Sequence, residues 1–249
     1  GVGITLIRAV KGKLYAIMNY ATPEGSSINT LTMLDGNTWN LAIKSQSSSL
    51  HGIEDLREHN GEFYIGEYQG GVSKLDKNEW VRIPTEDPYD LGRFTLLESY
   101  NGKLYACGEA SQYNKGNTYS LESFSYEEMK SNWKLELDYK DMCTFIKKAN
   151  GKLYVGADEW YDPAKAPQSI EVIKPLHVYD SKSWKSISFV NAPGLSKGQV
   201  VMGASAVEYF NGKLFIAVNT NYNTDFEIQP SFYTLDNNGV LAPLTWWKK

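Results

Sequence analysis

The sequence predicts an all-β fold, a five-bladed β-propeller with four antiparallel strands in each blade. Two observations lead to this prediction. A short hairpin motif recurs five times along the 249 residues, and a second hairpin motif, an aspartate four residues before a tryptophan, follows most of its copies. Recurrence at intervals of about 40 to 50 residues is typical of propeller blades.

The first motif is a glycine turn followed by a charged residue, an apolar residue and an aromatic ring. Its copies occupy residues 11–15, 60–64, 101–105, 150–154 and 211–215. The glycines stand at 12, 61, 102, 151 and 212, so the steps between them are 49, 41, 49 and 61 residues. Four copies carry Asn-Gly, which suits the two-residue turn of a β-hairpin. The motif therefore predicts the first two strands of each blade, with turns at 11–12, 60–61, 101–102, 150–151 and 211–212.

The strand that enters each turn has an alternating pattern. The residue five positions before each glycine is apolar: Ile7, Leu56, Leu97, Ile146 and Val207. The next residue is charged: Arg8, Arg57, Glu98, Lys147 and Glu208. A change from apolar to charged between neighbours indicates a strand and not a helix. We expect the apolar row to be buried and helical content to be low.

The second motif predicts the third and fourth strands of each blade. Its copies pair Asp35 with Trp39, Asp76 with Trp80 and Asp180 with Trp184, and Asp236 stands in the same place before Val240. The residues in between are turn formers. In the third blade the motif is irregular, with Tyr126 and Trp133 around a longer stretch. The predicted blades span approximately 1–46, 47–87, 88–140, 141–193 and 194–249 of one domain, 1–249.

These repeats resemble β-propeller repeats in general and, among them, kelch-type blades. The segment Val178-Tyr179-Asp180 with Trp184 carries the resemblance, whereas the Gly-Gly doublet of kelch repeats is missing after each second strand. Residues 35–39 also resemble a sialidase Asp-box that is one residue short. The resemblance implies the architecture, and we transfer no catalytic residue from either family.

Composition argues against two classes of partner. The net charge is −4, and no Lys/Arg cluster interleaves with aromatic residues as a nucleic-acid-binding surface requires. No apolar run approaches the roughly 20 residues that span a bilayer, so no membrane insertion is expected. The two cysteines, Cys107 and Cys143, are expected near each other, either bridged or as two thiols. For localisation, an extracellular or surface-associated site is favoured.

The connections between strands differ at the two ends of each blade. The turns within the two hairpins are short and uniform, whereas most second-to-third-strand connections are long and variable. Variable loops on a rigid scaffold usually contain the binding residues, and aromatic rings beside carboxylates and amides suit sugar recognition.

We therefore expect a non-enzymatic recognition propeller that binds a glycan or other extended ligand, or a protein. The expected ligand-binding residues are Tyr20, Glu67, Tyr68, Arg93, Tyr113, Trp160, Tyr161 and Tyr222. Alternatively, these loop residues pack only against one another.

A ring of polar residues lies seven positions before each glycine. Its members are Thr5, Glu54, Thr95, Thr144 and Ser205, expected around the axis near the variable loops. An alternative function is a glycoside hydrolase, which needs two carboxylates at a set separation. The carboxylates available for that role are Glu54, Asp55, Glu109 and Asp158. A third possibility is a protein-interaction or structural module of a surface or particle assembly.

No metal or cofactor is expected. The three histidines, His51, His59 and His177, lie outside metal-ligand spacings. Asp158 and Asp162 share one loop and are the only candidates that we single out for Ca²⁺. Two carboxylates are too few to predict a site.

Overall fold

The computed structural model describes residues 2–21, 27–43, 53–67, 71–77, 79–83, 91–110, 118–125, 133–139, 142–158, 175–195, 199–222, 229–236 and 239–244. Every regular element among them is a β-strand. The chain divides into two compact units, unit 1 with Gly1–Asp138 and unit 2 with Tyr139–Lys249. The prediction of one domain over 1–249 stays a prediction.

Unit 1 contains three meanders, each a run of four consecutive antiparallel strands. The first meander is β1 (Val2–Val10), β2 (Lys13–Ala21), β3 (Ser27–Asp35) and β4 (Thr38–Ile43). The second is β5 (Ile53–His59), β6 (Glu62–Glu67), β7 (Gly71–Asp76) and β8 (Glu79–Arg82). The third is β9 (Leu91–Tyr100), β10 (Lys103–Ala110), β11 (Thr118–Ser125) and β12 (Trp133–Tyr139).

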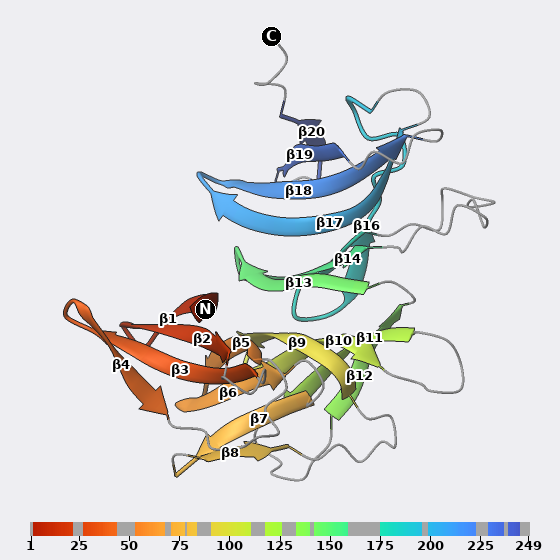
Figure 1. Ribbon diagram of the computed structural model, residues 1–249. Helices are drawn as coiled ribbons and strands as arrows, with labels where there is room; N and C mark the ends of the chain where they lie inside the picture. The colour runs from red at the N-terminus through yellow and green to blue at the C-terminus, as the bar shows by residue number, and fades with distance from the viewer. Residues whose placement is uncertain are drawn as a thin grey trace. The chain divides into compact units, whose positions relative to one another are not determined.

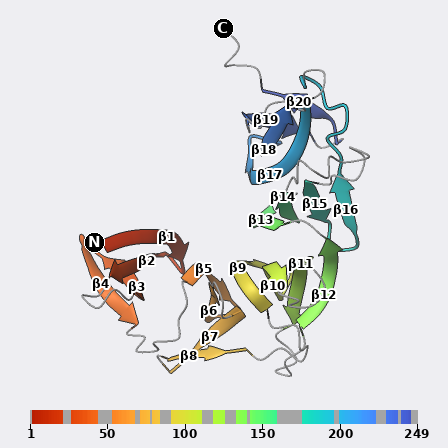
Figure 2. The same ribbon diagram turned by 45° about the vertical axis from the view of Figure 1, so that its right-hand side comes forward.

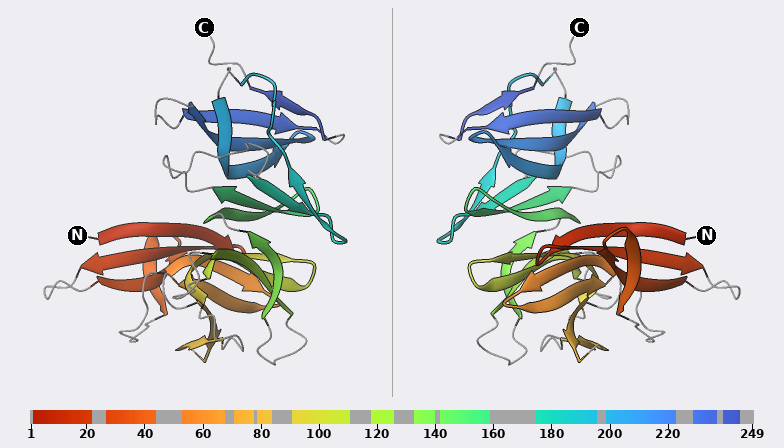
Figure 3. Two further views of the ribbon diagram at one scale, coloured as in Figure 1. Left: turned by 90° about the vertical axis from the view of Figure 1, so that its right-hand side faces the viewer. Right: turned by 90° about the vertical axis from the view of Figure 1, so that its left-hand side faces the viewer.

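Unit 2 contains two further meanders. The fourth meander is β13 (Met142–Ala149), β14 (Lys152–Asp158), β15 (Leu176–Tyr179) and β16 (Trp184–Ile187). The fifth is β17 (Gln199–Phe210), β18 (Lys213–Tyr222), β19 (Gln229–Leu235) and β20 (Leu241–Pro243). The long strands β17 and β18 lie side by side (Figures 1 and 3).

The strands form four sheets, so the prediction of five separate blades is wrong. Each meander of unit 1 is its own four-stranded sheet, in the order of the chain (Figure 2). The two meanders of unit 2 belong to one eight-stranded sheet (Figure 1). They merge because Asp158, the last residue of β14, pairs with Gly203 of β17. The all-β prediction and the antiparallel four-strand pattern are confirmed.

The five predicted first hairpins are present. At each turn a non-glycine residue with positive φ precedes a glycine with positive φ, as a two-residue hairpin turn requires. These residues are Lys11, Asn60, Asn101, Asn150 and Asn211, with φ between 44° and 49°, each before its glycine. The flanking strands pair across every turn.

The second hairpin motif also folds as predicted. Trp39 pairs with the residue before Asp35, and Trp80 pairs with the residue before Asp76. In the fourth meander the Trp184 ring stacks on Tyr179 with centroids 5.0 Å apart. In each case the aspartate stands at the turn, where its carboxylate can accept backbone N–H groups.

The predicted polar ring coincides with a set of β-bulges. In every first hairpin the register skips a residue of the first strand seven positions before the glycine, and this residue has no partner on the second strand. The third and fifth hairpins have a second shift, at Gly92 and Met202. The residues skipped at the shared position are Thr5, Glu54, Thr95, Thr144 and Ser205. These are the residues seven positions before each glycine, so their polar character marks the bulge. Their arrangement around a common axis stays a prediction.

Neighbouring meanders within a unit pack through their broad faces, in a β-propeller-like arrangement. In unit 1, Leu56 joins a core with Tyr15 and Ile17 of the first meander, and Leu97 joins a core with Tyr64 of the second. The apolar residue five positions before the glycine therefore packs against the preceding meander.

The first member of this apolar row departs from the prediction. Ile7 is 49% exposed, whereas Leu56, Leu97, Ile146 and Val207 are at most 4% exposed. The apolar pattern therefore does not by itself determine the burial of this position.

Candidate functional site

The carboxylate of Asp55 on β5 contacts several neighbouring groups of unit 1. Its side chain is 1% exposed. Oδ1 accepts hydrogen bonds from the Leu56 amide at 2.9 Å and from Arg8 Nε at 3.0 Å. Oδ2 accepts one from the Leu97 amide at 2.9 Å and lies 3.6 Å from Arg57 Nη2. A buried carboxylate is stable only when its oxygens are paired in this way.

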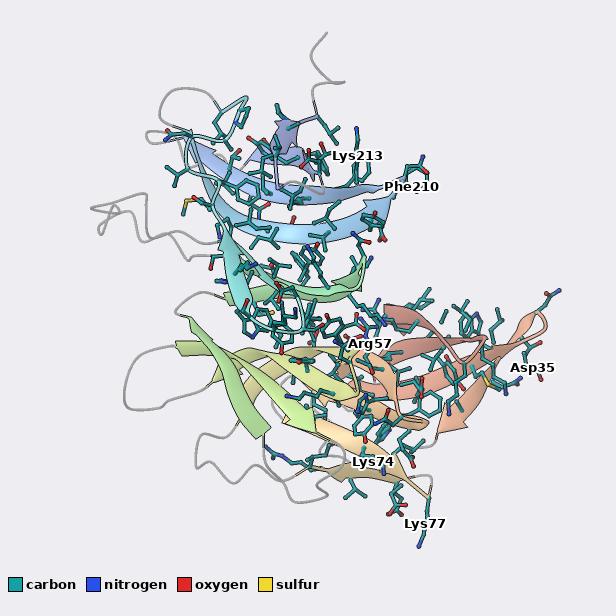
Figure 4. The ribbon with its side chains drawn as sticks, turned by 180° about the vertical axis from the view of Figure 1, so that it is seen from behind. Asp35, Arg57, Lys74, Lys77, Phe210 and Lys213 are labelled. Carbon is teal, nitrogen blue, oxygen red and sulfur yellow. The ribbon has the colours of Figure 1, made fainter. Side chains whose placement is uncertain are left out.

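Arg57 continues the same cluster toward β9. Its Nε donates to the Leu97 carbonyl at 2.6 Å, and its Nη2 lies 3.7 Å from Glu98 Oε2. Figure 4 marks this arginine among the side chains of unit 1. The cluster of Arg8, Asp55, Arg57 and Glu98 thus connects the first strands of all three meanders of unit 1. We call it the strand cluster.

Unit 2 has a simpler counterpart. Lys147 of β13 donates to the carboxylate of Glu208 on β17. This hydrogen bond lowers the pKa of Glu208 below its ordinary value. The five charged residues that follow the apolar row therefore serve as links between neighbouring meanders.

Sequence reasoning noted these charges only as a sign of strand alternation. A further signal was present: charges of opposite sign stand at matching positions of successive repeats, as in Arg57 and Glu98 or Lys147 and Glu208. Asp55 stands one position before the apolar row, where the other repeats have Leu6, Leu96, Phe145 and Ala206. A lone carboxylate at an otherwise apolar position predicts a buried ion pair.

The strand cluster has little capacity for acid–base chemistry. A general acid or base must reach its substrate, and the Asp55 carboxylate is enclosed and already accepts three hydrogen bonds. Its neighbour Glu54, the bulge residue, is exposed. Of this pair of carboxylates, Glu54 is the one that solvent reaches.

The predicted ligand-binding residues differ in how far the structure describes them. Glu67 ends β6, is 4% exposed and accepts a hydrogen bond from the Ser73 hydroxyl. Three of them lie in described strands with undescribed side chains: Tyr20 in β2, Arg93 in β9 and Tyr222 in β18. The same holds for two carboxylates of the hydrolase alternative, Glu109 in β10 and Asp158 in β14. Four predicted ligand-binding residues lie outside the described residues, namely Tyr68, Tyr113, Trp160 and Tyr161, as does the Ca²⁺ candidate Asp162.

The backbone nevertheless gives these residues a common position. Tyr20, Glu67, Glu109, Asp158 and Tyr222 each stand at the last or next-to-last residue of the second strand of a meander. This end of the strand is opposite the short hairpin turn. A tyrosine or a carboxylate residue thus stands within one residue of the end of every second strand, where the second-to-third-strand connections begin.

The buried histidine of the second meander has a defined hydrogen-bond environment. His59 is 1% exposed; its Nδ1 lies 2.8 Å from the Ser99 hydroxyl and its Nε2 lies 3.2 Å from the Asn60 amide nitrogen. Because the Asn60 amide donates to Nε2, the ring hydrogen belongs on Nδ1, which donates to Ser99. Burial lowers the pKa of His59, while the charge of Glu58 acts in the opposite direction.

The sequence left open whether the two cysteines are disulfide-bonded or are free thiols. Cys107 lies on β10 and Cys143 on β13, and both are disulfide-bonded. Among the described residues, no three His, Cys, Asp or Glu side chains come together to hold a metal ion. Nor do they include a helix long and apolar enough to cross a membrane.

Comparisons with known proteins show the fold of this chain but no family. No protein-family model and no curated protein sequence matches the chain, so the kelch resemblance gains no support. The chain is similar to the computationally designed Ika8 protein, with a TM-score of 0.50, 10% identity and coverage of 96% of this chain and 70% of that one. It is also similar to the extracellular domain of a protein described as a hybrid two component system from B. thetaiotaomicron, with a TM-score of 0.55 and 12% identity. That match covers 96% of this chain and 30% of the other.

Proposed function

We propose that this protein is a non-enzymatic recognition module that binds a glycan at the ends of its second strands, opposite the short hairpin turns. The observation that carries the proposal is that the second strands of four meanders end, within one residue, at a tyrosine or a carboxylate residue: Tyr20, Glu109, Asp158 and Tyr222. Aromatic rings stack on the CH faces of sugars, and carboxylates accept hydrogen bonds from sugar hydroxyls. Within each unit, such residues at the ends of the second strands provide contacts for a sugar ligand.

The hairpin ends of unit 1 are less suited to this role, because contacts between meanders occupy them. Lys11 donates to the Gly61 carbonyl at 2.6 Å, and its ammonium lies 5.5 Å from the centre of the Phe63 ring. The Glu58 carboxylate accepts a hydrogen bond of 2.5 Å from the Gly61 amide. These groups stabilise the frame, which leaves the opposite strand ends for recognition.

The role of Asp55 favours binding over hydrolysis. A glycoside hydrolase needs an acid and a second carboxylate that both reach the scissile bond, and Asp55 is enclosed in the strand cluster. The hydrolase alternative would have to use Glu54 with Glu109 or Asp158. A third alternative, a protein-interaction or structural module, predicts neither glycan binding nor turnover.

The disulfide-bonded cysteines support an extracellular or surface-associated location, since disulfides persist in oxidising compartments. The fold is also that of an extracellular domain in one of the similar structures. We extend this location to the present chain as part of the proposal.

A glycan array combined with a hydrolysis assay tests the proposal. Binding without turnover supports recognition, turnover that Glu54→Gln abolishes supports the hydrolase, and neither result supports the interaction module. For a bound glycan, we expect Tyr222→Ala or Trp160→Ala to weaken affinity at least tenfold, about 1.4 kcal/mol. Phe210→Ala is the matched control, because Phe210 is 62% exposed at the turn end of the same β17–β18 hairpin (Figure 4). Equal losses in Tyr222→Ala and Phe210→Ala would place the site elsewhere.

A further inference from the structure

Unit 2 contains a pocket that the sequence did not reveal. Its volume is about 520 Å³, within the usual range of small-molecule sites. Its lining comes from both meanders of the unit, β13–β16 and β17–β20. It lies at the hairpin end, because Asn150 of the β13–β14 turn and Gly239 of the β19–β20 turn both contribute to it. This position is opposite the strand ends of the proposed glycan site.

The two meanders are joined by backbone pairing at the opposite end of the strands. This pairing consists of Asp158 of β14 and Gly203 of β17, at the end of β14 that is far from the hairpin turn. The pocket lies toward the hairpin turns, between residues of both meanders.

The floor of the pocket is apolar. Tyr154 of β14 is 4% exposed and Leu214 of β18 is 3% exposed. Around them lie partly buried side chains that pack on the core of unit 2, among them Val178, Leu235 and Leu241. A floor of one aromatic ring and several aliphatic chains suits a flat or aliphatic ligand body.

Two lysines line the pocket, and they differ in their partners. Lys185 of β16 lies 3.4 Å from the Asp180 carboxylate. Backbone N–H groups of Ser183 and Lys182 also donate to Asp180, and together these contacts lower its pKa. The ammonium of Lys152, at the start of β14, is exposed and has no hydrogen bond or ion pair to any residue that the structure describes. Lys152 is therefore the cation that can receive a ligand anion without losing a partner.

The pocket also contains an acidic group, Asp236. Its Oδ1 accepts a hydrogen bond of 2.8 Å from the Val240 amide, which holds the carboxylate to its own turn. The pocket lining thus combines the exposed ammonium of Lys152 with buried apolar side chains.

We infer that this pocket binds a small amphiphilic carboxylate, with its apolar body on the Tyr154 and Leu214 floor and its carboxylate at Lys152. A carboxylate and an ammonium form a charge-assisted hydrogen bond that is stronger than a neutral one. The site is independent of the proposed glycan site, since it lies at the other end of the strands.

The test uses naphthylacetate and its neutral amide, naphthylacetamide, titrated into the full chain and followed by calorimetry. We expect the wild type to bind the carboxylate at least tenfold more tightly than the amide. Lys152→Met should weaken carboxylate binding at least tenfold and leave amide binding unchanged. Lys185→Met should have a smaller effect, because Lys185 is already paired with Asp180.

The matched control is Lys213→Met. Lys213 follows the glycine of the β17–β18 turn as Lys152 follows that of the β13–β14 turn, and it is exposed outside the pocket lining (Figure 4). Equal binding of acid and amide, equal effects of Lys152→Met and Lys213→Met, or no binding at millimolar concentration would each overturn the proposal. Circular dichroism and thermal melting check that the variants are folded.

Discussion

The Asp55 carboxylate accepts a 3.0 Å hydrogen bond from Nε of Arg8, so an ion pair joins β5 to β1 inside unit 1. Asp55→Ala would leave two backbone amides and two guanidinium groups without this acceptor. We expect the free energy of unfolding to fall by about 3 to 5 kcal/mol, as when one partner of a buried pair is removed. Chemical denaturation measures the change. Glu54→Gln, at the exposed neighbouring position, should stay within about 0.5 kcal/mol of wild type, and a similar loss in both variants would contradict the role given to Asp55.

Gly156 of the fourth meander lies close to the backbone of the fifth. A Cβ atom at this position would lie against the Phe145 ring and 2.5 Å from the Ala204 carbonyl oxygen. We expect Gly156→Ala to destabilise the protein by about 1 to 3 kcal/mol, the usual cost of overpacking. In a double-mutant cycle, adding Phe145→Leu should recover about 0.5 kcal/mol or more. Strict additivity would show that the ring does not cause the loss.

His59 predicts a pH dependence of stability. Burial lowers its pKa in the folded chain below the ordinary value, so the contribution of His59 is complete at neutral pH. As the pH falls below about 6.5, the unfolded chain takes up the proton more readily than the folded one, and stability declines. Urea denaturation at pH 7.5 and pH 5.5 measures this. His59→Asn should flatten the decline, and an unchanged profile would assign it to other groups.

The disulfide predicts a redox dependence of stability. Oxidised protein, once unfolded, should show no reactive thiol, and reduction should release two. Reduction should lower the free energy of unfolding by about 2 to 5 kcal/mol, the usual effect of losing a native disulfide. The variant with Cys107→Ser and Cys143→Ser is the control, and its melting temperature should not respond to reductant. Thiols that react without reduction would refute the bond.

The sequence was sufficient to predict the elements that depend on local chemistry. Asn60 before Gly61 specifies a turn with positive φ at both residues, and Asp180 before Trp184 specifies a hairpin whose turn is held by the aspartate carboxylate. Both signals act within a few residues of chain, so the repeat of each pattern was enough to locate the hairpins.

Features that depend on contacts between meanders could not be predicted from the sequence. The merging of two meanders into one sheet rests on Asp158 and Gly203, 45 residues apart along the chain, and no local pattern marks this pair. Ile7 has the same pattern as Leu56, yet it is exposed whereas Leu56 is buried. The pocket at Lys152 is likewise lined by residues of two meanders, so no single repeat encodes it.

The bulge in the first strand of each meander affects which side chains can be substituted there. A residue in a regular strand is held by alternation, since its neighbours across the strand share its face. Thr5, Glu54, Thr95, Thr144 and Ser205 have no such backbone partner on the second strand. Two of these hydroxyl groups are nevertheless engaged: Thr144 donates to the Ala204 carbonyl of β17, and Ser205 donates to the Ala217 carbonyl of β18 at 3.4 Å. Replacing either one removes a hydrogen bond, whereas Glu54 is exposed, so the bulge of the second meander is the natural place for protein engineers to install a metal ligand or a reactive group.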